Sequence, residues 1–251
     1  MAYVDLNIVA RLERSMLTSW PALSTAFDGD WVIRLAKGHT KRSNSVTCLG
    51  ADDAHLETRI DRVVQIFRDR DLPATFRLSP LASPALDRAL AKRGWRRFDE
   101  SIVMTADLAN IAHEPRDDDV LITSKPDDAW MEGCHLIDGL SEADAGTFGL
   151  MLDHLLPSAG YGRLVTDNGI GALALAVLDV ELAGLFVVMT AKERRRQGLA
   201  RRLLDSLLCW SRMRDATTGW LAVEAGNVPA VRLYERLGFR EVYRYHYRSN
   251  A

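Results

Sequence analysis

The sequence predicts an α/β (α+β) fold built from two related halves. Runs of β-type residues alternate with amphipathic helical segments along the 251 residues, and this alternation is typical of an α/β protein. The order of the segments is similar on both sides of a polar stretch at 110–119, which contains a proline and three consecutive acidic residues. Such a stretch indicates a linker. We therefore expect one domain at residues 1–112 and a second at 113–251.

The first half is expected to hold helices at 4–18, 53–70 and 84–92. The helix at 53–70 shows the pattern clearly, because Leu56, Ile60, Val63 and Phe67 recur at helical spacing and form one apolar face. Strands are expected at 31–36, 45–49, 74–78 and 102–105, with a turn at 38–44. This order gives a small sheet covered by helices.

The second half is expected to repeat that order. Helices are expected between 127 and 156 and at 199–213, and strands at 162–166, 172–178, 182–189 and 220–223. Asn227 can cap a last helix, Pro229 suits its first turn, and Gly238 can end it in a left-handed cap. Residues 84–95 show a similar pattern to 229–239 with a gap that differs by one residue, which supports duplication.

An arginine-rich turn with one glycine joins the expected strand at 182–189 to the helix at 199–213. The first N–H groups of a helix lack intrahelical partners, and this end of the helix dipole is positive. Gly198 has no Cβ, so an anion can approach the backbone, and the arginines add charged donors. The turn therefore predicts a pyrophosphate ligand, with a solvated charged helix start as the alternative. The nucleotide-binding motifs Gly-x-x-x-x-Gly-Lys-Ser/Thr and Gly-x-Gly-x-x-Gly are not found in this turn.

The motif Arg195-x-x-Gly198-x-Ala200 resembles the acetyl-coenzyme A loop of the GNAT superfamily of N-acyltransferases. A second GNAT signature is similar to the segment 220–239, in which a strand is followed by Asn-x-x-Ala, Leu-Tyr and Leu-Gly-Phe. The resemblance covers the C-terminal half. It implies two GNAT-like domains, each a mixed, mostly antiparallel twisted sheet flanked by helices, with a splayed parallel strand pair in the C-terminal one.

The first half is expected to have the fold without the cofactor loop. Its corresponding turn, 50–55, is acidic and lacks the Arg-x-x-Gly-x-Ala pattern. Negative charge at a helix start favours the helix but repels phosphate. This degenerate half could shape the acceptor cleft, act as a packing partner, or do both.

The resemblance also implies the residues that bind acetyl-CoA. The pantetheine arm is expected along the strand residues Phe186, Val187, Val188, Met189 and Thr190. The pyrophosphate is expected at the loop and helix start formed by Arg195, Arg196, Gln197, Gly198, Leu199, Ala200 and Arg201. Asn227 either contacts the arm or only caps its helix.

The resemblance also makes Tyr234, at the family's Leu-Tyr position, the expected catalytic acid, and the alternative is a core aromatic residue on the helix face. A phenol with an ordinary pKa near 10 is protonated at neutral pH and can protonate the leaving thiolate. Glu224 is a candidate general base, and a water relay without a dedicated side chain is the alternative. Asp179 and Glu181 are interpreted as solvated turn residues. The acceptor site is expected near 130–156 and 243–248, although the latter segment also fits a terminal strand with one buried face.

The composition agrees with these expectations. The net charge is −2, so neither a nucleic-acid nor a membrane partner is expected. The three cysteines are widely spaced and the six histidines show no ligand spacing, which indicates reduced thiols in a cytoplasmic protein and no metal site. Whether the chain forms a homodimer is left open.

The sequence thus predicts an enzyme that transfers an acetyl group from acetyl-CoA to a primary amine of a small molecule or peptide, by direct attack in a ternary complex. The alternative is a non-catalytic sensor or interaction module that binds acyl-CoA.

Overall fold

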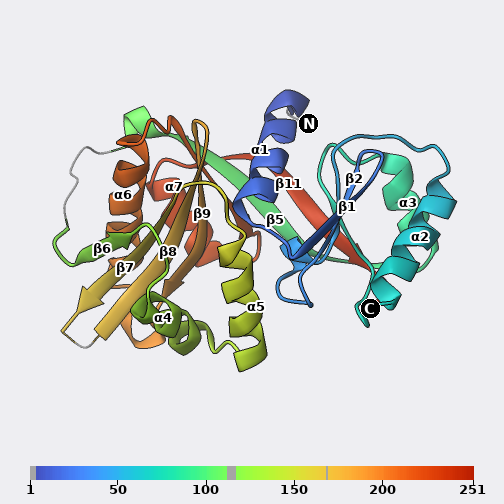
Figure 1. Cartoon of the computed structure of the whole chain (residues 1–251). Coiled ribbons are helices and arrows are strands. Elements are labelled where there is room, and N and C mark those ends of the chain that lie inside the picture. Colours follow the sequence, from blue (N-terminus) through green and yellow to red (C-terminus); the bar gives the residue numbers. More distant parts are fainter. Residues whose placement is uncertain (1–3, 112–116, 168) are drawn as a thin grey trace.

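The computed structural model describes residues 4–111, 117–167 and 169–251 and arranges their strands in one continuous sheet (Figure 1). The sheet has 11 strands in the order β1-β2-β3-β4-β11-β5-β10-β9-β8-β7-β6. The strands are β1 Ser24–Asp28, β2 Trp31–Leu35, β3 Val46–Cys48, β4 Thr75–Leu78, β5 Arg96–Asp107, β6 Val120–Thr123, β7 Ala159–Thr166, β8 Gly169–Asp179, β9 Leu182–Thr190, β10 Thr218–Glu224 and β11 Arg240–Ser249. The α-helices are α1 Leu6–Ser19, α2 Leu56–Arg68, α3 Pro84–Lys92, α4 Asp128–Asp138, α5 Glu142–Asp153, α6 Leu199–Arg212 and α7 Val228–Arg236.

The sheet is mixed and mostly antiparallel, as the sequence predicts. The pairs β3–β4 and β9–β10 are parallel, and the other neighbouring pairs are antiparallel. The sequence did not predict that the sheets of the two halves join. They join because β11 lies between β4 and β5, while β5 pairs with β10 on its other side. In Figure 1 these two long strands cross the middle of the molecule.

The crossing is an exchange of the last strand between two similar units. In each half, the last strand follows a short helix, α3 or α7, that has a capping side chain and a proline in its first turn. Both helices end at a left-handed glycine, Gly94 with φ 81° and Gly238 with φ 93°. The predicted echo between 84–95 and 229–239 is therefore present. The division of the chain at residue 112 stays a prediction.

Local sequence patterns located most elements, and two strands were not predicted. The helix α3 has the predicted bounds, and the other predicted elements are present with shifted ends. The unpredicted strands are β1 and β6. In β1 the side chains are mostly exposed, including Phe27 at 73%, so no buried face produces an alternating pattern. β5 is far longer than the predicted 102–105, and the linker predicted at 110–119 lies partly outside the described residues.

Three apolar cores place the helices on the sheet. Helices α2 and α3 cover the sheet of the first half, and α6 and α7 cover one face of the second half. The opposite face of the second half is covered by α4, α5 and also α1, whose residues Val9, Leu12 and Met16 join that core. The first helix of the chain therefore packs on the second half, near β8 and β9.

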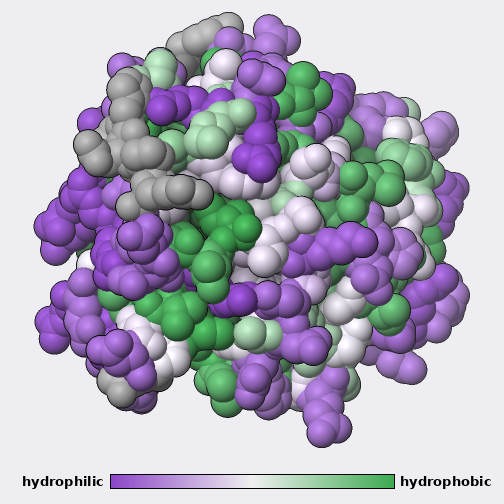
Figure 2. All heavy atoms as spheres, turned by 60° about the vertical axis from the view of Figure 1, so that its left-hand side comes forward, coloured by the Kyte–Doolittle hydropathy of each residue, from purple (hydrophilic) through white to green (hydrophobic). Residues whose placement is uncertain are grey.

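The outer surface of the second half is mostly hydrophilic, with apolar side chains gathered in the middle of the face that Figure 2 shows. All three cysteines are buried. Within the described ranges, no helix combines the length and apolar character needed to cross a bilayer.

A buried ion pair lies where α1 meets the exchanged strands. Glu13 on α1 and Arg77 on β4 are 0% and 2% exposed and form two hydrogen bonds, one of them 2.8 Å long between Arg77 Nη2 and Glu13 Oε1. The hydroxyl of Tyr243 on β11 donates to the same carboxylate at 2.5 Å. The three groups therefore tie the first helix to strands of both halves.

Glu13→Gln should lower the free energy of unfolding by about 3–5 kcal/mol, because it leaves the Arg77 charge buried without a counter-charge. Glu241→Gln, which breaks the exposed pair with Arg244, is the matched control and should cost less than about 1 kcal/mol. Urea unfolding followed by circular dichroism measures both. Similar losses in the two variants would contradict a structural role for the buried pair.

Candidate functional site

The turn before α6 has an open anion-binding geometry. Gly198 is the N-cap residue with φ 79°, and no side chain caps the helix. The first helical hydrogen bond runs from Arg202 N–H to Gly198 O at 3.1 Å, so the N–H groups of Leu199, Ala200 and Arg201 precede it. A Cβ placed on Gly198 would meet no atom within 4 Å. The structure therefore leaves room for a ligand at the positive end of this helix.

The side chains around this turn divide into two groups. Arg195, Arg196 and Gln197 are exposed and surround the helix start. Arg202 instead ties α6 to the start of β6 by binding Asp117 and Asp119, and its hydrogen bond lowers the pKa of Asp117. The predicted phosphate-binding residues are thus together on one loop and helix start.

Strands β9 and β10 separate beside this turn. Their parallel pairing ends at Leu185 and Leu221, whereas β9 continues to Thr190 and β10 to Glu224. The splayed parallel pair that the resemblance implied is therefore present. The edge of β9 from Phe186 to Thr190 faces the gap without a paired strand residue from β10.

A β-bulge bends β9 at the same place. Its pairing with β8 shifts register between Leu173 and Leu175, and Val187 has φ 53°. A positive φ is a conformational outlier for a β-branched residue, and strained backbone of this kind is maintained only when its surroundings hold it. The bulge redirects the backbone of the strand where the thioester is expected.

Tyr234 lies on α7 and is 7% exposed, with its ring 6.1 Å from that of Phe239. Burial raises the pKa of Tyr234 to about 12, although the charge of Arg42 opposes this increase. Arg42 belongs to the first half and donates a 3.2 Å hydrogen bond from Nη2 to Ala222 O on β10. The phenol is therefore protonated at neutral pH, as the predicted acid must be.

The other two predicted site residues lie at the end of β10. Glu224 is exposed, and strand alternation places it on the same face as Ala222. Asn227 caps α7, with its Oδ1 accepting from Ala230 N–H at 3.3 Å. The capping role of Asn227 is confirmed, whereas a contact with the pantetheine arm, and the role of Glu224, stay predictions.

A cavity of about 210 Å³ lies between the bulged part of β9 and the first half. Its walls are Trp20, His39, Thr40, Cys134, Leu140, Phe148, Val187, Val188 and Met189. Trp20 stacks on Phe186 at 5.3 Å. No local sequence pattern predicts that residues from the loop at 37–40 reach this strand, because their approach depends on how the two halves pack.

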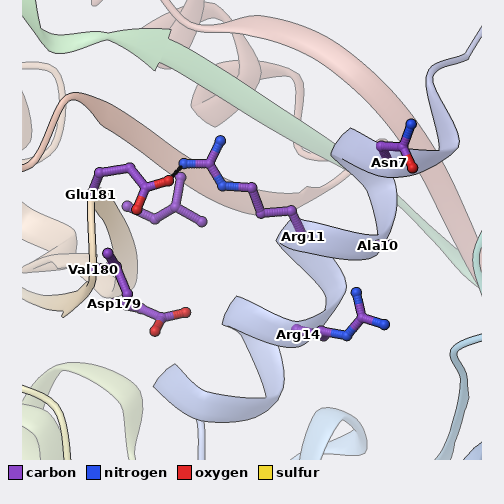
Figure 3. A pocket seen from close by; sticks show the side chains of 8 residues that line it. Asn7, Ala10, Arg11, Arg14, Asp179, Val180 and Glu181 are labelled. Carbon is purple, nitrogen blue, oxygen red and sulfur yellow. Dashed lines mark ion pairs between the residues drawn. The ribbon is translucent and has the colours of Figure 1, made fainter.

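A second hollow, of about 280 Å³, lies at the other end of β9 between α1 and the β8–β9 turn (Figure 3). Glu181 forms an ion pair with Arg11 across it, and Asp179 lies in the same turn. Glu181 is therefore in the turn, as predicted, although it is half-buried and holds α1 through Arg11, whereas Asp179 is the last residue of β8.

The terminal strand β11 has one buried face. Tyr243, Tyr245 and Tyr247 on β11 are all buried, which confirms the expected buried face of this strand. Among the residues that the structure describes, no group of three or more His, Cys, Asp or Glu side chains is arranged to hold a metal ion.

Sequence comparisons give relatives over nearly the whole chain and over about a third of it. Residues 8–248 match the family described as "Probable histone acetyltransferase Rv0428c C-terminal". The "Uncharacterized N-acetyltransferase YobR" of Bacillus subtilis is 26% identical over 249 residues, which are 97% of this chain and 99% of the relative. The "[Ribosomal protein bS18]-alanine N-acetyltransferase" of Escherichia coli K12 is 40% identical over 78 residues, or 31% of this chain and 53% of the relative.

Solved structures share the fold. A GCN5-related N-acetyltransferase from Kribbella flavida superimposes with a TM-score of 0.72 at 18% identity, covering 99% of this chain and 96% of that one. A tandem GNAT protein from the clavulanic acid biosynthesis pathway has a TM-score of 0.64 at 14% identity, covering 97% and 86%. The tandem architecture is thus found in a solved protein.

Gly198→Glu should weaken coenzyme A binding by about 100-fold, because it places a carboxylate where the diphosphate is expected. Gly94→Glu is the matched control, since Gly94 has φ +81° and also has no atom within 4 Å of an added Cβ. Both variants should lose similar stability, and only the first should lose affinity in calorimetric titration. Unchanged affinity in Gly198→Glu would refute the position of the diphosphate.

Proposed function

The chain belongs to the GNAT N-acetyltransferase family and is an acyltransferase, and from this premise we propose that it transfers an acetyl group from acetyl-CoA to a primary amine. The observation that carries the proposal is the uncapped start of α6 beside the splayed ends of β9 and β10. One molecule of acetyl-CoA fits both features. Its diphosphate suits the helix terminus, and its amide-containing arm suits the unpaired strand edge.

The residues of the loop and of β9 would hold the donor. The N–H groups of Leu199, Ala200 and Arg201 would bind the diphosphate, with charge from Arg195 and Arg196. The unpaired edge from Phe186 to Thr190 would pair with the pantetheine arm, as a peptide adds to a sheet edge. This places the thioester near the bulge at Val187.

The reaction then requires few groups. The amine nitrogen attacks the thioester carbonyl in a ternary complex, and a backbone N–H at the bulge is suited to stabilise the negative oxygen. Tyr234 donates its proton to the leaving thiolate. Its raised pKa of about 12 keeps that proton available across the neutral range.

The acceptor is proposed as the amine of a small molecule or of a peptide side chain or terminus. The family description and the E. coli relative name protein acceptors, and a cavity of about 210 Å³ is large enough for one amine-bearing group. The alternative function is acyl-CoA binding without turnover. That function does not require a protonated tyrosine at position 234.

Thiol release from acetyl-CoA in the presence of a panel of primary amines tests the proposal. Amine-dependent release with acetylated product detected by mass spectrometry is the expected result. Tight binding of acetyl-CoA without amine-dependent release across aliphatic, aromatic and peptidyl amines would favour the sensor.

Tyr234→Phe should reduce kcat by about 10²–10⁴-fold while leaving the affinity for coenzyme A unchanged, because only the proton donor is lost. Tyr161→Phe is the matched control, since burial also raises the pKa of Tyr161 to about 12 and that residue is not one of the walls of the cavity.

The pH dependence of the wild-type kcat gives a second test of Tyr234 as the acid. Because Tyr234 keeps its proton until the pH approaches about 12, the wild-type kcat should not fall between pH 7 and pH 10 through ionisation of this residue. A kcat for Tyr234→Phe equal to that of the wild type would exclude it as the acid.

A further inference from the structure

We propose that His39, oriented by Asp144, accepts the proton of the acceptor amine, and that the cavity between the two halves takes a small primary amine with an apolar carbon frame. The proposal rests on the acyl transfer proposed above. It assigns a catalytic group to the half of the chain that lacks the cofactor loop.

His39 lies where a proton acceptor is needed. It lines the same cavity as Val187, Val188 and Met189, which form the bulged strand where the thioester is expected. Glu224 is not one of the residues lining this cavity, and it is exposed at the far end of β10. Trp220 and Ala222 precede Glu224 on the same face of β10, and neither side chain carries a proton acceptor.

The imidazole of His39 is paired with a carboxylate. His39 Nδ1 lies 3.4 Å from Asp144 Oδ1 on α5, and Ser141 Oγ donates to Asp144 Oδ2 at 2.6 Å. The Ser141 hydrogen bond, together with His39, lowers the pKa of Asp144, so this carboxylate is ionised at neutral pH. A carboxylate on one ring nitrogen orients the imidazole and stabilises its protonated form, which leaves Nε2 as the nitrogen for the substrate.

The loop that presents His39 is strained and firmly held. Lys37, Gly38 and Thr40 all have positive φ values, of 49°, 83° and 58°. The buried side chain of Asn44 holds this loop with hydrogen bonds to both sides: its Oδ1 accepts from Ala36 and Gly38 N–H at 2.8 and 2.9 Å, and its Nδ2 donates to the carbonyls of His39 and Thr40 at 2.8 Å.

Two strained β-branched residues therefore meet at one cavity. Thr40 on the loop and Val187 on β9 both have positive φ and both line it. Strained backbone persists where the surrounding structure over-determines it, and it concentrates at functional sites. The two halves contribute one such residue each.

The walls indicate the class of amine. Trp20 and Phe148 lie with ring centroids 5.8 Å apart, and Phe148 lies 5.6 Å from the ring of His39. Aromatic faces attract an alkylammonium group and pack against hydrocarbon. The volume of about 210 Å³ is below the range of about 300–1,000 Å³ typical of sites for drug-sized ligands, so the cavity fits a compact amine or a single amine-bearing side chain.

The proton steps balance. His39 Nε2 takes one proton from the ammonium group, and the neutral nitrogen then forms the C–N bond with the thioester carbonyl carbon. Collapse breaks the C–S bond, and the thiolate takes the proton of Tyr234. The second proton lost by the nitrogen restores Tyr234 through solvent, and His39 releases its proton to solvent, so that the products are an amide, a thiol and one proton.

The groups that can titrate around His39 come from two helices. Asp144 faces it from α5, and the thiol of Cys134 lines the cavity from α4. The adjoining part of β9 presents Val187, Val188 and Met189, and the loop itself presents Thr40.

The test measures steady-state thiol release from acetyl-CoA with a compact aliphatic or aromatic primary amine, between pH 6 and pH 9. His39→Asn should lower kcat by about 100-fold or more, leave KM for acetyl-CoA unchanged and abolish the fall of activity at acidic pH. Asp144→Asn, at a side chain that is 48% exposed, should fold normally. It should lower kcat and leave KM for acetyl-CoA unchanged, because the imidazole loses the carboxylate that orients it.

The chain offers a matched control in a second histidine–aspartate pair. His246 on β11 lies 3.2 Å from Asp87 on α3, away from the cavity, and His246→Asn should leave kcat and the pH profile unchanged. Glu224→Gln, at the competing candidate base, is measured in parallel, and a loss of kcat as large as that of His39→Asn would favour Glu224 as the base.

The outcomes separate the two proposals. The role of His39 alone would be overturned if His39→Asn turned over as fast as the wild type. It would also be overturned if Glu224→Gln or His246→Asn slowed turnover as much as His39→Asn does. Amine-dependent release absent in the wild type would overturn the proposed function together with this role. Turnover confined to large or highly charged amines would overturn the proposed class of acceptor.

Discussion

The exchange of β5 and β11 is the constraint on which the rest of the structure depends. Each strand completes the sheet of the other half, since β11 pairs with β4 and β5 pairs with β10. A half without its partner would expose two sheet edges in the middle of its core, which natural proteins avoid. The exchange therefore fixes the relative position of the halves more tightly than packing of two closed domains would, and the buried Glu13, Arg77 and Tyr243 lie at the same junction.

Fixed halves allow the degenerate one to take part in the site without binding a cofactor. In this half, His55 is the N-cap residue of α2 and has a left-handed conformation with φ 55°. It has the position before α2 that Gly198 has before α6. Asp52 and Asp53 precede it, so the geometry of the helix start is retained while its charge repels phosphate. The same half places Trp20, His39 and Thr40 against β9 and Arg42 against β10. These contacts confirm that the first half packs against the second half, whereas shaping of the acceptor cleft stays a prediction.

The sequence predicted the features that depend on local chemistry. The open turn at Gly198, the Asn227 cap and the bounds of α3 follow from side-chain types within one turn of a helix, where the backbone has few alternatives. The length of β5 and the position of β11 could not be predicted in this way, because the mostly polar residues 96–100 have strand partners on β11 and none on β10. The cavity was missed for the same reason: Trp20 and His39 are separated from Val187 by more than half of the chain, and no local pattern records their contact.

The arrangement also explains how a duplicated unit can become asymmetric. The first half lacks the arginine-rich turn that precedes α6, yet its strands β1 to β5 belong to the same sheet as the strands of the second half. Its loops are consequently free to change while its strands are not. The strained loop at 37–40 shows the result, since Asn44 stabilises a conformation that a simple connection between β2 and β3 would not require. Four hydrogen bonds hold this strained loop at the wall of the cavity, and strained backbone of this kind concentrates at functional sites.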